Sequence, residues 1–235
     1  MSDAKKDGLG ARMKSQYEDR ARFQLPRRAY TLIRVDGRAF HTLLRGAEKP
    51  FDPRVTQAMT EVLRSLTEEC GGSFIGYCQS DEASVVLQDF KEDGTQAWFD
   101  GNVQKIASIS ASIATATFNQ HMGWMGTAHF DARCWSMADP VEVANYLVWR
   151  QKDWKRNAIQ MIAQSYFSAK ELHGKSSEQQ TDMIIAKGWR EWESTSQLFG
   201  WMTTRNDNGV KLDSAFDFTE QYDRLLNMIP RIRPT

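Results

Sequence analysis

The middle of the fold is predicted by one stretch, Ser73-Phe-Ile-Gly-Tyr-Cys-Gln-Ser-Asp-Glu-Ala-Ser-Val-Val-Leu-Gln-Asp-Phe90. It holds two apolar runs, residues 73–79 and 83–90, whose length and composition are typical of buried strands. Only Ser80-Asp81-Glu82 separates these runs, and so short a connection is typical of antiparallel neighbours. We therefore expect a β-hairpin here.

The segment before this hairpin predicts a strand and a helix. Residues 29–35 are typical of a buried strand, which ends abruptly at Asp36-Gly37. Asp52-Pro53 supplies an N-cap and a first-turn proline for a helix that Gly71-Gly72 ends. The apolar residues of this helix recur at helical spacing: Val55, Met59, Val62, Leu63, Leu66 and Cys70.

The segment after the hairpin completes the order of elements. Residues 97–119 predict a helix that packs through small side chains (Ala107, Ala111 and Ala114), and residues 126–135 predict a strand. The resulting order, β-α-β-β-α-β, is the split βαβ or ferredoxin-like pattern, in which two helices cover one face of an antiparallel sheet. The sequence therefore predicts an α+β fold.

The remaining residues predict a mostly helical C-terminal region. Asp139-Pro140 with Glu142 begins a helix, and helical patterns run through residues 156–172 and 178–187. A second hairpin is expected across Asn206-Asp-Asn-Gly209, between residues 196–205 and 209–218. We expect three parts: a polar arm (1–22), a sheet domain (23–138) and a C-terminal region packed on it (139–235).

Composition limits the class of protein. The 235 residues, 41% hydrophobic and 26% charged, are typical of a globular chain. Thirty basic and 30 acidic side chains give zero formal net charge, which excludes nucleic-acid binding by overall positive charge but permits a local basic face. Because the three cysteines match no zinc spacing and no apolar run is long enough to span a membrane, we expect a cytoplasmic protein with reduced thiols.

Carboxylates at strand ends carry the chemical signal. Asp36 closes the first strand, and Asp81 and Glu82 lie between the second and third. The first and third strands of a split βαβ sheet are neighbours, so these turns can meet at one edge. With the carbonyl oxygen of Gly37 they would form a hard-oxygen site suited to Mg²⁺. Two such ions about 4 Å apart would support phosphoryl or nucleotidyl transfer. The alternative is structural, since Asp-Gly and Ser-Asp-Glu are also common in turns.

Four blocks resemble the signatures of the tRNA(His) guanylyltransferase family. They are Arg34-Val-Asp-Gly-Arg-Ala-Phe-His41, Lys49-Pro-Phe-Asp52, Tyr77-Cys-Gln-Ser-Asp-Glu-Ala-Ser84 and Trp149-Arg-Gln-Lys-Asp153. The resemblance covers roughly residues 25–205, with the same order and similar spacing. It implies a palm-like catalytic domain, two Mg²⁺ ions, ATP and GTP as substrates, and addition of nucleotides to tRNA 5′ ends in the 3′–5′ direction. It also suggests a homotetramer.

The resemblance implies roles for individual residues. The metal ligands fall on Asp36, the Gly37 carbonyl and Asp81, with Glu82 beside them as a further catalytic acid. Nucleotide contacts fall on Lys49, Asp52 and Ser80, and on the turn whose backbone amides line the triphosphate: Arg38, Ala39, Phe40 and His41. Asp52 would have to combine this role with the helix cap, and the sequence does not decide between them.

One segment departs from the eukaryotic members of the family. Lys155-Arg-Asn-Ala-Ile-Gln-Met-Ile162 keeps only Asn157 of a His-x-Asn-Asn-x-Tyr-Asn-Thr block and looks like the bacterial and archaeal branch, which favours template-dependent repair of 5′-truncated tRNA. The acceptor stem would lie along a basic surface that includes Arg150, Lys152, Lys155, Arg156 and Asn157. Such a charge run is also typical of a solvated helix face.

Other functions stay open at this point. A tRNA(His)-specific guanylyltransferase would share the whole site, and a palm-type nucleotide cyclase would share the two-metal centre without RNA. An RNA-binding module of the RRM type has the same order of elements but needs exposed aromatic side chains on its central strands. Those strands here, residues 32–35 and 84–87, offer mostly aliphatic and small side chains.

Overall fold

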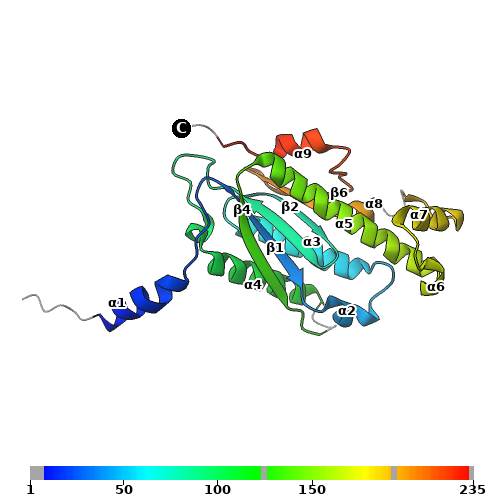
Figure 1. The fold of residues 1–235 in the computed structure, drawn as a ribbon, viewed down its shortest axis with the longest axis horizontal. Coiled ribbons are helices and arrows are strands. Elements are labelled where there is room, and N and C mark those ends of the chain that lie inside the picture. The colour runs from blue at the N-terminus through cyan, green and yellow to red at the C-terminus, as the bar shows by residue number, and fades with distance from the viewer. Residues whose placement is uncertain (1–7, 123–125, 192–194, 233–235) are drawn as a thin grey trace, which may run out of the picture.

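The computed structural model describes residues 8–122, 126–191 and 195–232. Its centre is a six-stranded sheet in the order β4-β1-β3-β2-β5-β6, in which every neighbouring pair is antiparallel (Figure 1). The strands are β1 (Tyr30–Gly37), β2 (Ser73–Gln79), β3 (Glu82–Leu87), β4 (Phe130–Met137), β5 (Trp201–Asn206) and β6 (Gly209–Ser214). The predicted α+β class and the split βαβ order of the first four strands are confirmed.

The hairpin between β2 and β3 is tighter than expected. Gln79 pairs with Glu82, so only Ser80 and Asp81 form the turn, and Glu82 is the first residue of β3. Ser80 takes the left-handed conformation, with φ of 49°, which allows the chain to reverse within two residues. The expectation of a three-residue connection was wrong, and Glu82 therefore has a fixed place in the sheet.

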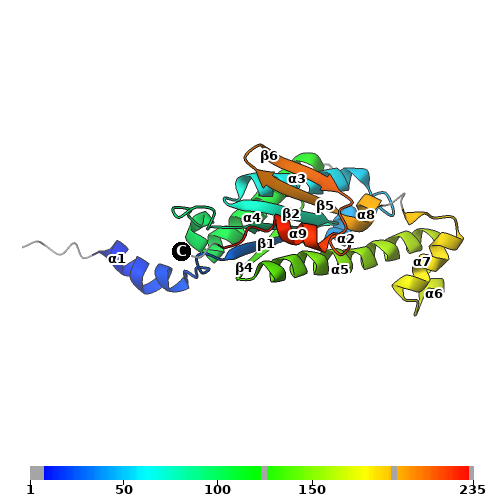
Figure 2. The ribbon, with the colours of Figure 1, turned by 90° about the horizontal axis from the view of Figure 1, so that it is seen from above.

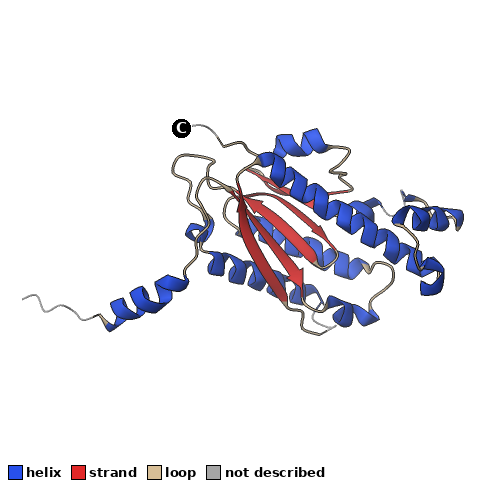
Figure 3. Cartoon of the chain, viewed as in Figure 1, coloured by secondary structure: helices blue, strands red, loops and turns tan. Residues whose placement is uncertain are grey.

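Two helices cover one face of the sheet, as predicted (Figure 3). Asp52 caps α3 (Pro53–Glu69), and the apolar stripe of this helix is buried. The second helix, α4 (Val103–Met122), begins later than predicted because Phe99 and Asp100, with left-handed backbones, interrupt the chain before it. Its buried stripe mixes small and large side chains: Ile106, Ser110, Ala114, Phe118 and Met122. Ala107 and Ala111 are only half-buried.

A single long helix, α5 (Pro140–Tyr166), crosses the opposite face of the sheet with the short α9 (Tyr222–Met228) (Figure 2). The Asp139 side chain accepts a hydrogen bond from the Val141 amide and so caps α5, as predicted. No break occurs at residue 156, and the helix continues to Tyr166. The second half of α5 packs against α6 (Ala169–Leu172), α7 (Ser177–Ala186) and α8 (Thr195–Phe199).

The C-terminal hairpin extends the sheet, since β5 pairs with β2. Residues 196–199 were expected in a strand but lie in α8, which ends where Gly200 takes a left-handed backbone with φ of 75°. The sheet thus joins strands from both sides of residue 139, and the division into three parts stays a prediction.

The described residues of the N-terminal arm form an exposed helix that projects from the body (Figure 2). It comprises α1 (Leu9–Met13) and its continuation through Ala21, while residues 1–7 of the predicted arm lie outside the described ranges. Within the described ranges, no helix combines the length and apolar character needed to span a bilayer.

Candidate active site

The sheet register brings the predicted acids together at one end of β1. Asp36 pairs across the strands with Glu82 of β3 on one side and with Asp131 of β4 on the other. The Gly37 amide donates a hydrogen bond of 3.0 Å to the carbonyl oxygen of Asp81. The end of β1 and the β2–β3 turn therefore adjoin. Asp131 was missed by the sequence analysis, because a single acid in an edge strand shows its neighbours only once the register is known.

Asp36 and Asp81 form no ion pair with a described residue. Burial raises the pKa of Asp36, and repulsion from Glu82 and Asp131 adds to the rise, while Arg34 and Arg133 oppose it. Burial also raises the pKa of Asp81, with Asp36 and Glu82 adding, although hydrogen bonds from its own amide and the Ser80 hydroxyl oppose the shift. The pair thus concentrates negative charge that a bound cation would relieve.

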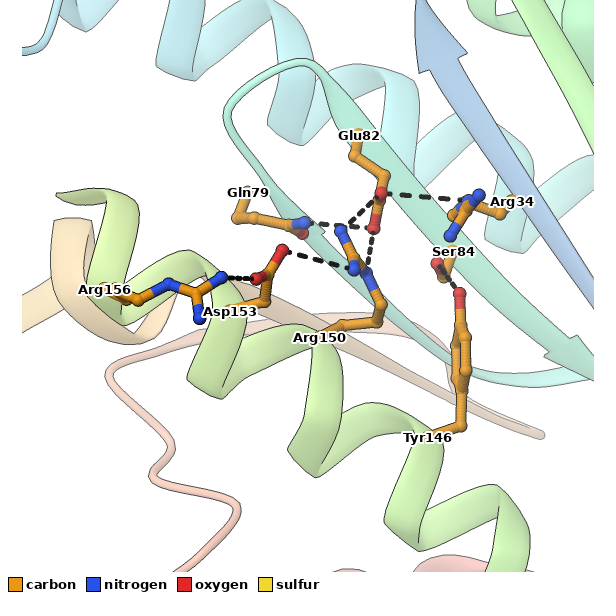
Figure 4. A network of polar contacts seen from close by, with 8 residues as sticks. All are labelled: Arg34, Gln79, Glu82, Ser84, Tyr146, Arg150, Asp153 and Arg156. Atoms are coloured by element: carbon orange, nitrogen blue, oxygen red, sulfur yellow. Dashed lines mark hydrogen bonds and ion pairs between the residues drawn. The ribbon is translucent and has the colours of Figure 1, made fainter.

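Glu82, in contrast, is fully engaged by protein groups (Figure 4). Arg150 of α5 donates hydrogen bonds to both carboxylate oxygens of Glu82, from Nε to Oε1 at 2.8 Å and from Nη2 to Oε2 at 2.7 Å. The Gln79 amide donates a third hydrogen bond of 3.0 Å to Oε1, and the Arg34 Nε lies 3.8 Å from Oε2. Glu82 is only 6% exposed. Its charge is therefore neutralised inside the protein rather than offered to a ligand.

Few side chains are available to complete a metal shell. Across the described ranges, no group of three or more histidine, cysteine, aspartate or glutamate side chains is arranged to hold a metal ion. Magnesium commonly takes only one or two carboxylates and fills its octahedron with water and phosphate oxygens. Asp36, Asp81 and the Gly37 carbonyl are a donor set of that kind.

The turn after β1 is held by packing and by its backbone. Ala39 has a left-handed backbone with φ of 55° and precedes the short helix α2 (Phe40–Leu43). The buried ring of Phe40 packs against Phe118 and Phe130, with ring centroids 5.0 and 5.1 Å away. The Arg38 amide already donates to the carbonyl of His129. The side chains of Arg38 and His41 are exposed, and the first amides of α2 have no partner within the helix.

Three predicted nucleotide contacts line a single cavity. Lys49, Asp52 and Ser80 lie around it, between the loop before α3, the end of β2 and α5. Apolar walls come from both regions of the chain, including Phe51, Met59, Trp154 and Trp201. We call this cavity the Lys49 pocket; its mixed polar and apolar lining and its position at Ser80, next to Asp81 in the chain, are typical of a small-molecule site.

The structure shows how Asp52 is used. Its side chain accepts hydrogen bonds from the amides of Glu48 (3.0 Å) and Arg54 (2.9 Å) and from the Arg54 guanidinium (2.6 and 3.0 Å). The Arg54 side chain holds the pKa of Asp52 well below its usual range. Asp52 therefore caps α3 and fixes the loop that carries Lys49. Its predicted contact with a nucleotide stays a prediction.

The five predicted RNA contacts on α5 do not share one surface. Arg150 points inward to Glu82, and its Nη1 also reaches Asp153 at 3.4 Å. Lys155 pairs with Glu191 at 2.9 Å and lies over the Phe199 ring. Arg156 is exposed and pairs with Asp153, and Lys152 and Asn157 are exposed. Of the five, Lys152, Arg156 and Asn157 face solvent and stay predicted RNA contacts.

Comparison with known proteins gives consistent results. A family model described as tRNAHis guanylyltransferase matches residues 10–138. A bacterial tRNA(His) guanylyltransferase-like protein solved in complex with ATP is 34% identical, with a TM-score of 0.87 over 94% of this chain and 98% of that one. One solved with GTP is 32% identical, with a TM-score of 0.79 over 94% and 99%. An uncharacterised protein, R259 of Acanthamoeba polyphaga mimivirus, is 31% identical over 75% of this chain and 69% of its own length.

Proposed function

The chain belongs to the tRNAHis guanylyltransferase family and is a nucleotidyltransferase, and we propose that it adds nucleotides to the 5′ ends of truncated tRNAs in the 3′–5′ direction, with Mg²⁺ as cofactor. The observation that carries the proposal is the meeting of Asp36 with the Asp81 turn at the end of β1. Two acids that gather there, with no ion pair to a described residue, suit a reaction in which triphosphate charge must be bound and rearranged.

The residues present fit a magnesium site. Asp36, Asp81 and the Gly37 carbonyl would hold the metal, and the raised pKa values of both acids reflect burial and repulsion from neighbouring acids, which a divalent cation would relieve. When bound, Mg²⁺ would assist deprotonation of the attacking group and stabilise the charge of the leaving group. Glu82 would have a positioning role and would not bind the metal directly, because Arg150 occupies both of its carboxylate oxygens.

The proposed chemistry has two steps on a 5′-monophosphorylated RNA. An oxygen of the 5′ phosphate attacks the α-phosphorus of ATP, the bond to the β-phosphate breaks, and pyrophosphate leaves. The 3′ hydroxyl of an incoming nucleoside triphosphate then attacks the activated 5′ phosphorus, loses its proton, and displaces AMP. A 5′-triphosphate end needs no activation. Lys49 would neutralise triphosphate charge, and the amides of the turn around Ala39 would bind its oxygens.

The direct test is extension of a tRNA that lacks its first nucleotide, with Mg²⁺, ATP and labelled GTP. We expect the wild-type protein to extend it, and Asp36→Asn and Asp81→Asn each to lower the rate by about 100-fold or more. Asp207→Asn is the matched control, because the Asp207 side chain is 92% exposed. Equal extension by the wild type and both variants would refute the metal-site assignment.

Substrate range separates repair from tRNA(His) guanylylation. The loss of all but Asn157 from the eukaryotic block favours repair of several truncated tRNAs. Extension of several truncated tRNAs at comparable rates would support repair, whereas extension of tRNA(His) alone would identify the guanylyltransferase activity. Product from a nucleoside triphosphate without RNA would instead indicate a cyclase. The homotetramer and the cytoplasmic location are further proposals, and light scattering tests the first.

A further inference from the structure

We propose that a second pocket, lined by Arg34, Trp135, Tyr146 and Trp149, binds the base of the 5′-terminal nucleotide of the RNA by stacking. This inference rests on the function proposed above, because it supplies that reaction with a site for its second substrate. We call it the Trp149 pocket. It lies between β4 and the first half of α5 and is distinct from the Lys49 pocket.

The aromatic side chains form a continuous wall. Trp135 of β4 packs edge-on against Tyr146 of α5, with centroids 5.4 Å apart, and Tyr146 meets Trp149 in the same way at 6.0 Å. Tyr146 is fixed further by a hydrogen bond to the hydroxyl of Ser84 (Figure 4). Trp149 closes the series and is 55% exposed. A large ring held by neighbouring rings and left open to solvent presents a ready stacking surface for a nucleobase.

The lining of the pocket contains one cation, Arg34, and one acid, Glu142, with Asn145 beside it. Arg34 lines it, and the Nε of Arg34 is buried without a hydrogen bond to any described residue. Its nearest acid is Glu82, whose oxygens already bind Arg150. Glu142 accepts a hydrogen bond of 3.0 Å from the side-chain amide of Asn145, so the pocket offers a cationic donor at Arg34 and an acid that is already engaged. The unpartnered Nε of Arg34 can donate to an oxygen of the base or phosphate of a nucleotide in the pocket.

The pocket also lies at the right place for the second substrate. Arg34 and Asp36 point to the same face of β1 and are two residues apart, about 7 Å along the strand. That is within the reach of one nucleotide. In the sheet order, the Trp149 pocket lies over β4 and β1, whereas the Lys49 pocket lies beside the end of β2. The carboxylates stand between the two, as a reaction that joins two nucleotides requires.

Arg150 contacts both the stacking ring of Trp149 and the acid Glu82. Its guanidinium lies over the Trp149 ring, with the central carbon 4.7 Å from the ring centroid, while it holds Glu82 beside Asp36. The orientation of the stacking ring is therefore tied to the acid cluster. A base on the outer side of Trp149 would extend this stack.

The test is binding of a tRNA acceptor stem that carries 2-aminopurine as its 5′-terminal nucleotide, since this fluorescent base is quenched when it stacks on an aromatic ring. We expect wild-type protein to quench it, Trp149→Ala to abolish the quenching, and Trp149→Phe to restore most of it. Loss of one stacked base should weaken RNA binding about 5- to 140-fold. Tyr166→Ala is the control, because Tyr166 is on the same helix, is 44% exposed, and lies outside the pocket. It should quench like the wild type.

Steady-state extension gives an independent measurement. Trp149→Ala should raise the KM for RNA and leave the KM for GTP unchanged. The proposal fails if Trp149→Ala quenches like the wild type while the wild type extends tRNA, or if Trp149→Ala alters the oligomeric mass and not the quenching, which would assign the ring to a contact between copies. If the wild type extends no tRNA, it is the proposed function that fails, whereas the quenching still reports on the pocket.

Discussion

The sharpest test of the site is removal of the Arg150 guanidinium by Arg150→Met. This change leaves Glu82, only 6% exposed, with the Gln79 amide and with Arg34 at 3.8 Å. Breaking one side of a buried ion pair costs about 3–5 kcal/mol, because the remaining charge is stranded. Arg34 can take up part of that charge, so we expect a loss near the lower end, about 3 kcal/mol. For a chain of this size that lowers Tm by about 6–12 °C.

The assay is urea unfolding of the full-length protein, with Arg156→Met as control. Arg156 pairs with Asp153 at the exposed surface, where such pairs contribute at most about 1 kcal/mol. In the double variant Arg150→Met/Glu82→Gln, we expect the loss to fall short of the sum of the single losses by about 2 kcal/mol, because the partners are removed together. If Arg150→Met is no more destabilising than Arg156→Met and instead flattens the salt dependence of RNA binding, Arg150 is an RNA contact and the structural interpretation is refuted.

Three further predictions concern packing, capping and thiol access. Gly37→Ala would place a Cβ 2.4 Å from the Phe40 ring and should lower the free energy of unfolding in urea by about 1–3 kcal/mol. Gly46→Ala, whose new Cβ would have no atom within 4 Å, should lower it far less. Equal losses of stability in the two variants would contradict the close approach at Gly37. The pKa of Asp52 is lowered in the folded state, so the stability that its carboxylate contributes is present at neutral pH and is lost as pH falls below about 4. Asp52→Asn should therefore flatten the pH dependence of the free energy of unfolding between about pH 5 and 2. An unchanged pH profile would exclude this cap. Burial raises the pKa of all three cysteines, to about 12 for Cys70, but Cys134 is only half-buried whereas Cys70 and Cys78 are buried. A thiol reagent should therefore label Cys134 first and the others only on unfolding, and equal labelling of all three in the native state would contradict this.

Local chemistry explains why much of the fold could be predicted from the sequence. The cap residues Asp52 and Asp139, each followed by proline, fixed two helix starts correctly. The bounds of β2 agree with the prediction because its apolar run is bordered by turn residues. What failed were features decided by tertiary contacts. The helical pattern predicted over residues 156–172 is the second half of α5 followed by α6, and the end of α5 at Tyr166 between them was not predicted. The helical form of residues 196–199, which were expected in a strand, ends at the left-handed turn at Gly200.

In the site, too, some features could be predicted from the sequence and others depend on tertiary contacts. Topology alone predicted that the turns carrying Asp36 and Asp81 would meet, because strands one and three of the split βαβ order are neighbours. It could not predict that Arg150 turns inward, since its partner Glu82 is 68 residues away in the chain. A signal was nevertheless present. Arg150 lies three residues after Leu147 and four before Trp154, both buried, and therefore on the inner face of α5 rather than with the solvated charges around it.

The placement of charges in the acid cluster indicates a functional role and not a stabilising one. The antiparallel register sets three acids side by side on adjacent strands, Asp131, Asp36 and Glu82, and Asp81 adjoins them. A fold selected for stability alone would pair or replace such acids, because like charges brought together and partly buried oppose folding. The protein supplies Arg150 for Glu82 and leaves Asp36 and Asp81 unpaired among the described residues. The absence of a described ion pair for these two acids is best explained by a cationic ligand that takes that place during the reaction.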